Sequence, residues 1–230
     1  MSVQEVSEDA DWNVFYIDGE WVTPDDRDTI DVENPATREK FAEVPAGQPE
    51  DVDRAYEAAE EAQKEWAEWS YEERAEELQK VIDALQSKQM DISNLLAIES
   101  GSATPKAMAE IQTTRADFEE VSTLDEDPHR RREYDSQFAG KENFVQREPV
   151  GVVGVIIPWN FPLHMATRSV APALAFGNSV VVKPPSETPI TAGLAIASLI
   201  EETDIPDGVF NVVTGKGSDI GDEVAGHPKA

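Results

Sequence analysis

A tryptophan and an amide side chain stand between two prolines directly after an apolar run. The run covers residues 151–157, and the segment after it, residues 158–162, reads PWNFP. Trp159 offers a flat apolar wall against which a ribose or an aromatic ring can pack. Asn160 offers an amide donor of the kind that stabilises an oxyanion when a carbonyl is attacked. The motif alone supports this chemistry and a strand-ending turn with a packed tryptophan about equally.

A lysine follows a second apolar run, NSVVVKP at residues 178–184. After such a strand, the ammonium group of Lys183 could lie only at the mouth of a site, where it would donate hydrogen bonds to ribose hydroxyls or phosphate. Ser186 and Glu187 lie within reach on the next turn. The alternative, a surface lysine whose stem lies along apolar neighbours, is about equally well supported.

Three glycines follow a third apolar run, GVFNVV at residues 208–213. Gly215, Gly217 and Gly221 read G-x-G-x-x-x-G, which is one residue too long for the dinucleotide-binding fingerprint. A glycine turn that leads into a helix is common. By itself, this spacing is weak support for a cofactor site.

Cysteine and histidine usage argues against a metal centre. The chain has no Cys, which excludes disulfides, thiolate metal sites and a cysteine nucleophile within these residues. The three histidines, His129, His164 and His227, have no ligand-like spacing and no acidic partner in register. We therefore expect no metal site.

The elements that must position these residues alternate between apolar strands and helices from residue 151 onward. We expect helices at residues 164–177 and 190–203, the second with Thr188 as N-cap and Pro189 at its first position. Continuous apolar strands separated by helices are typical of a parallel α/β sheet. Ligands bind such sheets beyond the carboxyl ends of the strands, which is where the three candidate segments lie.

The N-terminal part is expected to form turns and then helices. The expected landmarks are, in order, a hairpin at residues 15–22 about Asp18 and Gly19, a turn at 34–37, a helix from Pro49, a second helix opened by a capping box at Ser70 and Glu73, a stop at Gly101, and a third helix ending near Pro128. Residues 131–148 then favour a projecting hairpin with its turn near Gly140. The arginines at 130–132 favour a solvated or salt-bridged face over a ligand site.

The charge of the chain is strongly acidic. Asp and Glu number 47 against 19 Lys and Arg, for a formal net charge of -28. Nucleic acid and anionic membranes are therefore unexpected partners. The even spread of acid indicates a solvated surface adapted to high salt, where screening removes self-repulsion. With neither a signal-peptide pattern nor an apolar run long enough to span a membrane, we expect a halophile's cytoplasmic protein.

Three segments together carry a resemblance: QREPVGVVGVIIPWNFPL, NSVVVKPPSETP and IPDGVFNVVTGKGSDIG. They resemble the NAD(P)-dependent aldehyde dehydrogenase superfamily, and YIDGEWV and VENPAT are similar to its opening hairpin and turn. The resemblance runs from about residue 15 to the end of the chain. It implies a Rossmann-like parallel sheet with helices on both faces, an N-terminal helical region and a projecting oligomerisation hairpin.

Site roles follow from the resemblance by position. Asn160 would be the catalytic oxyanion donor. Residues 156–159 would line the nicotinamide and ribose side of the cofactor groove, Lys183 would bind the adenine ribose, and Gly215 with Gly217 would bind the adenine end. The implied set for NAD or NADP is Ile156, Ile157, Pro158, Trp159, Lys183, Ser186, Glu187, Gly215, Gly217 and Gly221.

The sequence departs from the family pattern at two places. Many NAD-preferring members read Lys-x-x-Glu, whereas here Ser186 holds the place of the Glu, so NADP use is also expected. The chain also stops before the segments that carry the family's catalytic Cys and general base. We therefore expect a disordered tail at 1–11, an incomplete NAD(P)-binding domain at 12–130 and 149–230, an oligomerisation hairpin at 131–148, and no catalytic domain.

The expected function is that of a piece of an enzyme. By family, the whole protein would oxidise an aldehyde to a carboxylic acid with NAD(P)+ as a homo-oligomer, a dimer or tetramer. Without nucleophile or base, this polypeptide alone is expected to be inactive and, with an open sheet edge, prone to self-association. The alternative is a non-catalytic oligomerisation partner of full-length subunits. A free-standing dinucleotide-binding module is the weakest hypothesis.

Overall fold

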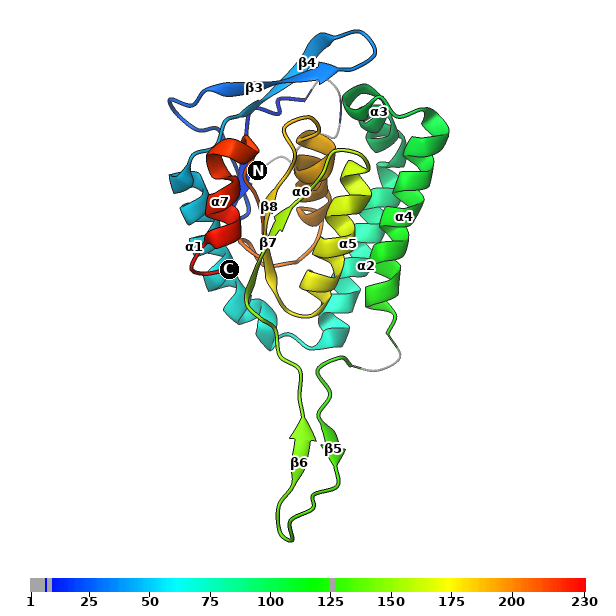
Figure 1. The fold of residues 1–230 in the computed structure, drawn as a ribbon. Helices are drawn as coiled ribbons and strands as arrows, with labels where there is room; N and C mark the ends of the chain where they lie inside the picture. Colours follow the sequence, from blue (N-terminus) through cyan, green and yellow to red (C-terminus); the bar gives the residue numbers. More distant parts are fainter. Residues whose placement is uncertain (1–6, 8–9, 125–126) are drawn as a thin grey trace.

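The computed structural model describes residues 7, 10–124 and 127–230. Most of the tail expected to be disordered lies outside the described residues. The centre of the fold is a five-stranded sheet in the order β2-β1-β9-β8-β7 (Figure 1). Its strands are β1 (Phe15–Ile17), β2 (Glu20–Val22), β7 (Val152–Ile156), β8 (Ser179–Lys183) and β9 (Phe210–Val212).

Strands β7, β8 and β9 are parallel, as the alternation of strands and helices predicted. The N-terminal hairpin extends this sheet, because β1 pairs antiparallel with β9 as well as with β2. Asp18 and Gly19, at the predicted turn, both have positive φ (57° and 71°), which suits a tight two-residue hairpin turn. The sheet is therefore mixed, with β7 at one edge of its described strands.

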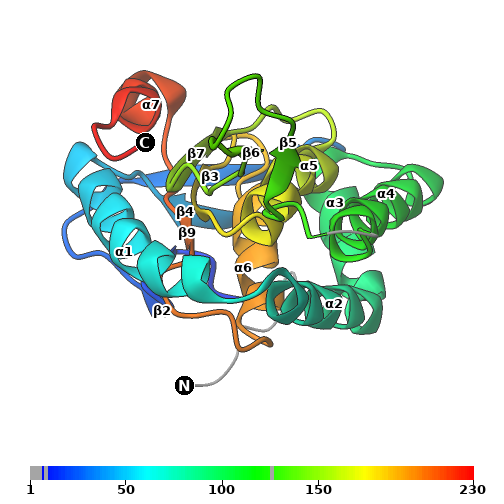
Figure 2. The same cartoon turned by 90° about the horizontal axis from the view of Figure 1, so that it is seen from below.

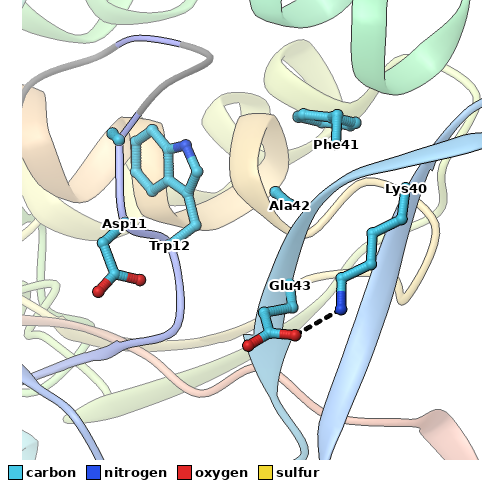
Figure 3. Close-up of a pocket in the computed structure, with 7 residues that line it drawn as sticks. Asp11, Trp12, Lys40, Phe41, Ala42 and Glu43 are labelled. Carbon is cyan, nitrogen blue, oxygen red and sulfur yellow. Dashed lines mark hydrogen bonds and ion pairs between the residues drawn. The ribbon is translucent and has the colours of Figure 1, made fainter.

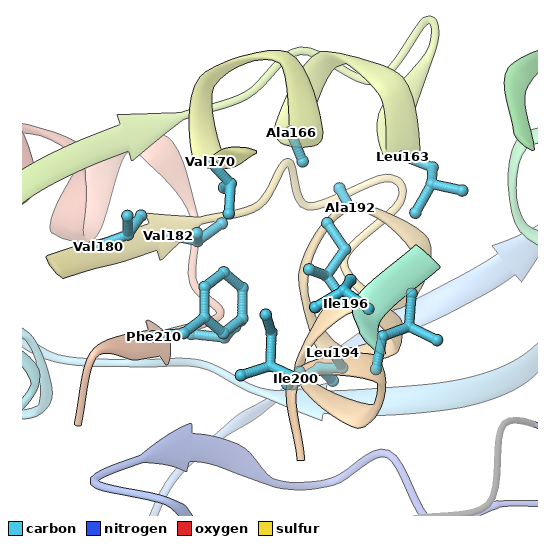
Figure 4. Close-up of a cluster of buried hydrophobic side chains, with 14 of the residues drawn as sticks. Leu163, Ala166, Val170, Val180, Val182, Ala192, Leu194, Ile196, Ile200 and Phe210 are labelled. Carbon is cyan, nitrogen blue, oxygen red and sulfur yellow. The ribbon is translucent and has the colours of Figure 1, made fainter. Parts of the chain in front are cut away.

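Helices cover both faces of the sheet, and β8 is therefore buried on both sides. Val180 and Val182 of β8 point into one apolar cluster with α5 (Pro162–Ala175) and α6 (Ala195–Ile200), shown in Figure 4. Val181 points into a second cluster with α1 (Pro49–Glu68) and α7 (Gly217–Gly226). The period-2 alternation of a strand thus fills two cores.

Three further helices form an outer layer over α5 and α6 (Figures 1 and 2). They are α2 (Tyr71–Ser87), α3 (Gln89–Ser100) and α4 (Thr104–Ser122). The predicted capping box is confirmed, since the Ser70 hydroxyl accepts from the Glu73 amide and the Glu73 carboxylate accepts from the Ser70 amide. Gly101 ends α3 with φ 66°. The region between Ser70 and Gly101 holds two helices, separated by a break at Lys88. One expectation was wrong, because α4 ends at Ser122, before Pro128.

Two hairpins lie outside the main sheet. β3 (Thr29–Asn34) and β4 (Glu39–Pro45) flank the predicted NPAT turn, where the Asn34 side chain accepts a hydrogen bond from the Ala36 amide. β5 (Arg132–Tyr134) and β6 (Asn143–Val145) form the predicted projecting hairpin, at the end of the molecule opposite β3 and β4 (Figure 1). Every residue of β5 and β6 is exposed. None of the helices in the described part of the chain could cross a membrane.

Candidate functional site

The three candidate segments meet at one edge of the sheet. Ile156 at the end of β7 pairs in register with Lys183 at the end of β8, and Val182 pairs with Val212 at the end of β9. The chain leaves β7 and β8 on the side facing β3 and β4 (Figure 1), and β9 runs parallel to β8. The Ser186 hydroxyl lies 3.5 Å from the Gly215 carbonyl oxygen, which links the second segment to the third.

The first segment presents open side chains beyond β7. Trp159 is 60% exposed and Ile156 is 50% exposed, while Asn160 is exposed and its amide makes no hydrogen bond to any described residue. Ile157 differs, because its side chain is buried in the core. An unpaired amide beside an exposed aromatic wall is an arrangement that can receive a carbonyl oxygen and a flat ring.

Lys183 is a buried lysine. The residue is 3% exposed, and its ammonium group donates to the Pro184 carbonyl oxygen at 2.8 Å. Burial lowers the pKa of this ammonium group, and nearby Glu187 opposes that effect. The interpretation as a surface lysine is therefore wrong. A single neutral acceptor leaves two N–H groups of the ammonium free to donate.

The three glycines of the third segment differ in how much space a side chain would have at each position. A Cβ on Gly215 would lie 2.5 Å from Ile220 Cδ1, so Gly215 lets α7 pack closely on the loop. Gly217 and Gly221 have open space where a Cβ would stand. Gly47, which sequence reasoning missed, donates its amide to the Thr214 carbonyl at 2.9 Å and has no room for a Cβ beside that oxygen.

Ser186 and Glu187 border a surface cavity of about 370 Å³. Its wall is acidic, because Asp31, Glu33 and Glu187 line it. A phosphate group placed there would meet repulsion from these carboxylates. A second cavity, shown in Figure 3, lies beside Trp12 and β4 and has no residue of the three candidate segments in its lining.

Two buried glutamates from the outer layer hold the helices of the sheet layer, and sequence reasoning missed both. Glu110 on α4 accepts hydrogen bonds from the amides of Leu163 (2.8 Å) and His164 (3.4 Å) at the start of α5. Its other carboxylate oxygen is buried and makes no hydrogen bond to a described residue. This oxygen lies 3.6 Å from the ammonium nitrogen of Lys106. Burial raises the pKa of Glu110. A carboxylate here satisfies free amides and complements the helix dipole directly after the PWNF segment.

Glu99 has the same role at the next helix, and it overturns the predicted N-cap. The helix after β8 begins as a π-helical turn (Ile190–Leu194), whose amides at Ile190 and Thr191 donate to Glu99 at 2.7 and 2.8 Å. The Thr188 hydroxyl is buried without a partner among the described residues, so it does not cap the helix. Burial raises the pKa of Glu99 to about 7.

Two histidines do have acidic partners, which corrects the expectation from sequence spacing. His164 Nδ1 lies 2.9 Å from Asp117 Oδ2, and His227 Nε2 lies 3.0 Å from Asp53 Oδ1. The partners are 47 and 174 residues away in the sequence, so no local pattern could reveal them. The described residues contain no group of three His, Asp or Glu side chains that could hold a metal ion.

Comparison with known proteins identifies a family match. The family model described as "Aldehyde dehydrogenase family" matches residues 21–230. Vanillin dehydrogenase from Corynebacterium glutamicum is 43% identical over 212 residues, covering 92% of this chain and 43% of the relative. D-glyceraldehyde dehydrogenase (NADP(+)) from Picrophilus torridus is 36% identical over 219 residues, covering 94% and 43%.

Solved structures agree with this match. The crystal structure of a NAD-dependent benzaldehyde dehydrogenase from Corynebacterium glutamicum superimposes with a TM-score of 0.89 at 41% identity, covering 94% of this chain and 47% of that chain. The chain therefore spans less than half the length of these relatives.

Proposed function

The chain belongs to the aldehyde dehydrogenase family, and from that membership we propose that the whole protein oxidises an aldehyde to a carboxylic acid with NAD(P)+. The observation that carries the proposal is the meeting of the PWN, KPPSE and TGKG segments at the carboxyl ends of three neighbouring parallel strands. Ligands of open parallel sheets bind at this edge. The cofactor would supply the acceptor for the hydride that leaves the aldehyde carbon.

Asn160 is the proposed oxyanion donor. When a nucleophile adds to the carbonyl carbon, negative charge develops on the oxygen, and a preorganised amide N–H stabilises it. The prolines at 158 and 162 restrict the backbone on both sides of Asn160. The chain has no Cys, so these 230 residues do not supply the thiol nucleophile of the proposed reaction.

The cofactor would lie across the three strand ends. Trp159 and Ile156 offer exposed apolar surface for the nicotinamide and ribose side. Lys183 would donate from its ammonium group to the adenine ribose. Gly215 with Gly217 would bind the adenine end, and a Cβ on Gly217 or Gly221 would meet only open space. Ile157 and Pro158 would contribute backbone shape, and Ser186 and Glu187 would border the ribose.

We propose that NADP is accepted as well as NAD, with NAD preferred. Ser186 is small and neutral, which leaves room for a 2′-phosphate near Lys183, but the acidic cavity wall beside it opposes that charge. Ser186→Glu adds a carboxylate that would accept from a ribose 2′-hydroxyl and repel a phosphate. We expect kcat/KM with NADP to fall about 10-fold or more, on the scale of one charged contact, while NAD is retained. Ser186→Gln is the matched neutral control, and an equal loss with both cofactors would contradict the assignment.

The β5–β6 hairpin is the proposed subunit contact. Four large apolar side chains are more than half exposed on it: Tyr134, Phe138, Phe144 and Val145. An isolated two-stranded hairpin is marginally stable in water, and an exposed apolar patch marks an interaction surface. We propose that residues 131–148 join copies of the protein in a dimer or tetramer. Residues 12–130 and 149–230 would form the cofactor-binding part.

The same hairpin supports a second candidate function. A chain that lacks the nucleophile but keeps the subunit contact could act as a non-catalytic partner of full-length subunits. Co-purification with an intact aldehyde dehydrogenase would favour this candidate. A salt-adapted, cytoplasmic setting is proposed for either candidate, on the net charge of -28.

The proposed activity is tested by reading the gene beyond codon 230 and assaying its complete product. NAD(P)H formation at 340 nm with an aldehyde panel is the expected result. A complete product that oxidises no aldehyde would overturn the enzyme proposal. Separately, fluorescence of the 230-residue chain should be quenched on NAD titration if Trp159 lies in the cofactor groove, with a Trp159→Phe variant to identify the signal.

A further inference from the structure

A polar pair lies just beyond the proposed oxyanion donor. His164 is in the first turn of α5, four residues after Asn160, and its ring meets that of Phe161 edge to face with centroids 6.2 Å apart. Asp117 reaches it from α4, with 2.9 Å between Asp117 Oδ2 and His164 Nδ1. On the Phe161 ring, the Lys106 ammonium group lies 4.4 Å from the centroid.

Asp117 fixes which nitrogen of the ring is free. The same carboxylate oxygen accepts from the Thr167 hydroxyl at 2.8 Å, so Asp117 is held as an acceptor toward both neighbours. A carboxylate acceptor requires a proton on His164 Nδ1. In the neutral ring, Nε2 then carries the lone pair and can only accept a hydrogen bond.

Nε2 is open rather than buried. His164 is partly exposed, with 25% of its side chain accessible. Nε2 makes no hydrogen bond to a described residue, and the atom is accessible to solvent. An oriented ring with a free acceptor is more than a contact between two helices requires.

We propose that His164 is a specificity-determining residue that accepts a hydrogen bond from a hydroxyl group on the aldehyde, and that Asp117 is its positioning residue. The inference rests on the proposed function, in which the carbonyl oxygen lies at Asn160. With that oxygen fixed, the body of a short or aromatic substrate would lie along Phe161. Its far end would then point toward the first turn of α5, where His164 lies four residues after Asn160. The preferred substrate class is therefore a hydroxylated aldehyde.

The test compares matched aldehydes on the complete enzyme. Benzaldehyde and 4-hydroxybenzaldehyde differ only in the hydroxyl group. We expect His164→Phe, which keeps an aromatic ring, to lower the kcat/KM ratio of hydroxylated to plain aldehyde about 3- to 10-fold, the scale of one hydrogen bond, mainly through KM. His164→Gln keeps an acceptor and should restore part of the ratio. Gln112→Ala, at an exposed position on α4, is the control and should leave the ratio unchanged.

Each outcome decides a different point. A ratio that His164→Phe leaves unchanged would make the pair a helix–helix clamp and overturn the inference, with the proposed activity intact. Oxidation of no aldehyde at all would overturn the proposed function first. A readout independent of activity is imidazole ¹⁵N NMR of the 230-residue chain in high salt. It should show His164 protonated at Nδ1, with that preference reduced by Asp117→Asn, and a neutral ring protonated at Nε2 would overturn the inference.

Discussion

At the residue scale, Asn160 is distinguished by what it does not contact. Three residues later, Leu163 is buried and its backbone amide donates to Glu110. The Asn160 side-chain amide, by contrast, is exposed and makes no hydrogen bond to a described residue. A buried polar group without a partner would be costly, but an exposed one is available to a ligand at little cost. Availability beside a rigid backbone is the property that an oxyanion donor requires.

Removing this amide should affect the chemical step. In the complete enzyme, Asn160→Ala should lower kcat by about 10²- to 10³-fold, the cost of losing one oxyanion donor. Cofactor affinity should change little. Steady-state kinetics measures the first effect and NAD titration the second. Asn94→Ala, at an exposed position on α3, is the control. A change in KM with kcat intact would contradict the assigned role.

Glu99 gives a prediction about pH. Its pKa is about 7 when folded against an ordinary value of 4.5, so between these limits the folded chain holds a proton that the unfolded chain has lost. The stabilising contribution of Glu99 is therefore full below pH 4.5 and is lost as pH rises through 7. The advantage of wild type over Glu99→Gln should shrink by about 1–3 kcal/mol from pH 5 to pH 8.

Urea unfolding of both proteins at fixed high salt measures this difference. The comparison with Gln cancels the many surface carboxylates that the two proteins share. Glu72→Gln, at an exposed position in the first turn of α2, is the control and should show no such trend. An advantage that grows with pH would mean that the hydrogen bonds from Ile190 and Thr191 outweigh burial.

At the element scale, the exposed apolar side chains of the β5–β6 hairpin predict that it contributes to subunit assembly. Phe138 and Phe144 are 68% and 51% exposed. Replacing both with Ser should shift the complete protein to a smaller assembly without changing its far-UV circular dichroism. Light scattering after size-exclusion chromatography measures the mass. Met90→Ser, which alters an equally exposed apolar residue on α3, should leave the mass unchanged. Retention of the full assembly by the double variant would overturn the proposed contact.

Elements that depend on short-range interactions could be predicted from the sequence, and pairings between distant residues could not. The Asp18-Gly19 hairpin and the Ser70–Glu73 capping box depend on residues two or three apart, and both were predicted. The pairing of β1 with β9 depends on residues almost 200 positions apart, and no pattern indicated it. The apolar runs located the three strand ends because burial on both faces removes polar residues from a strand.

The candidate site divides in the same way. Trp159, Asn160 and Lys183 were chosen as candidates from their positions after apolar runs, and their site roles remain proposals. The meeting of their segments follows from the parallel order of the strands. Glu99 and Glu110 look like two more acids in an acidic chain, and only the tertiary structure shows that they are buried against helix starts. The N-cap predicted at Thr188 was wrong for the same reason, because the amides at the start of the helix donate to the distant Glu99 carboxylate.

At the scale of the whole molecule, the net charge of -28 sets the expected response to salt. Carboxylates on one surface repel one another, and mobile ions screen that repulsion within about 8 Å at physiological ionic strength and about 3 Å at 1 M. Raising KCl from 0.1 M to 2 M should raise the urea midpoint of unfolding. Sucrose at equal osmolality separates screening from solute exclusion. Full stability in dilute buffer, unchanged by KCl, would contradict salt adaptation.

The strand β1 has a consequence for how the chain is made. Besides its hairpin partner β2, β1 pairs with β9, where Tyr16 faces Val212, and the Asp18 amide donates to the Asn211 side chain, 193 residues away. During synthesis, the β1–β2 hairpin therefore leaves the ribosome long before β9 exists, and Phe15 and Ile17 then lack Val181 and Val213, with which they share a buried cluster in the folded chain. A nascent chain halted before residue 210 should remain sensitive to protease at its N-terminus and become resistant once β9 emerges.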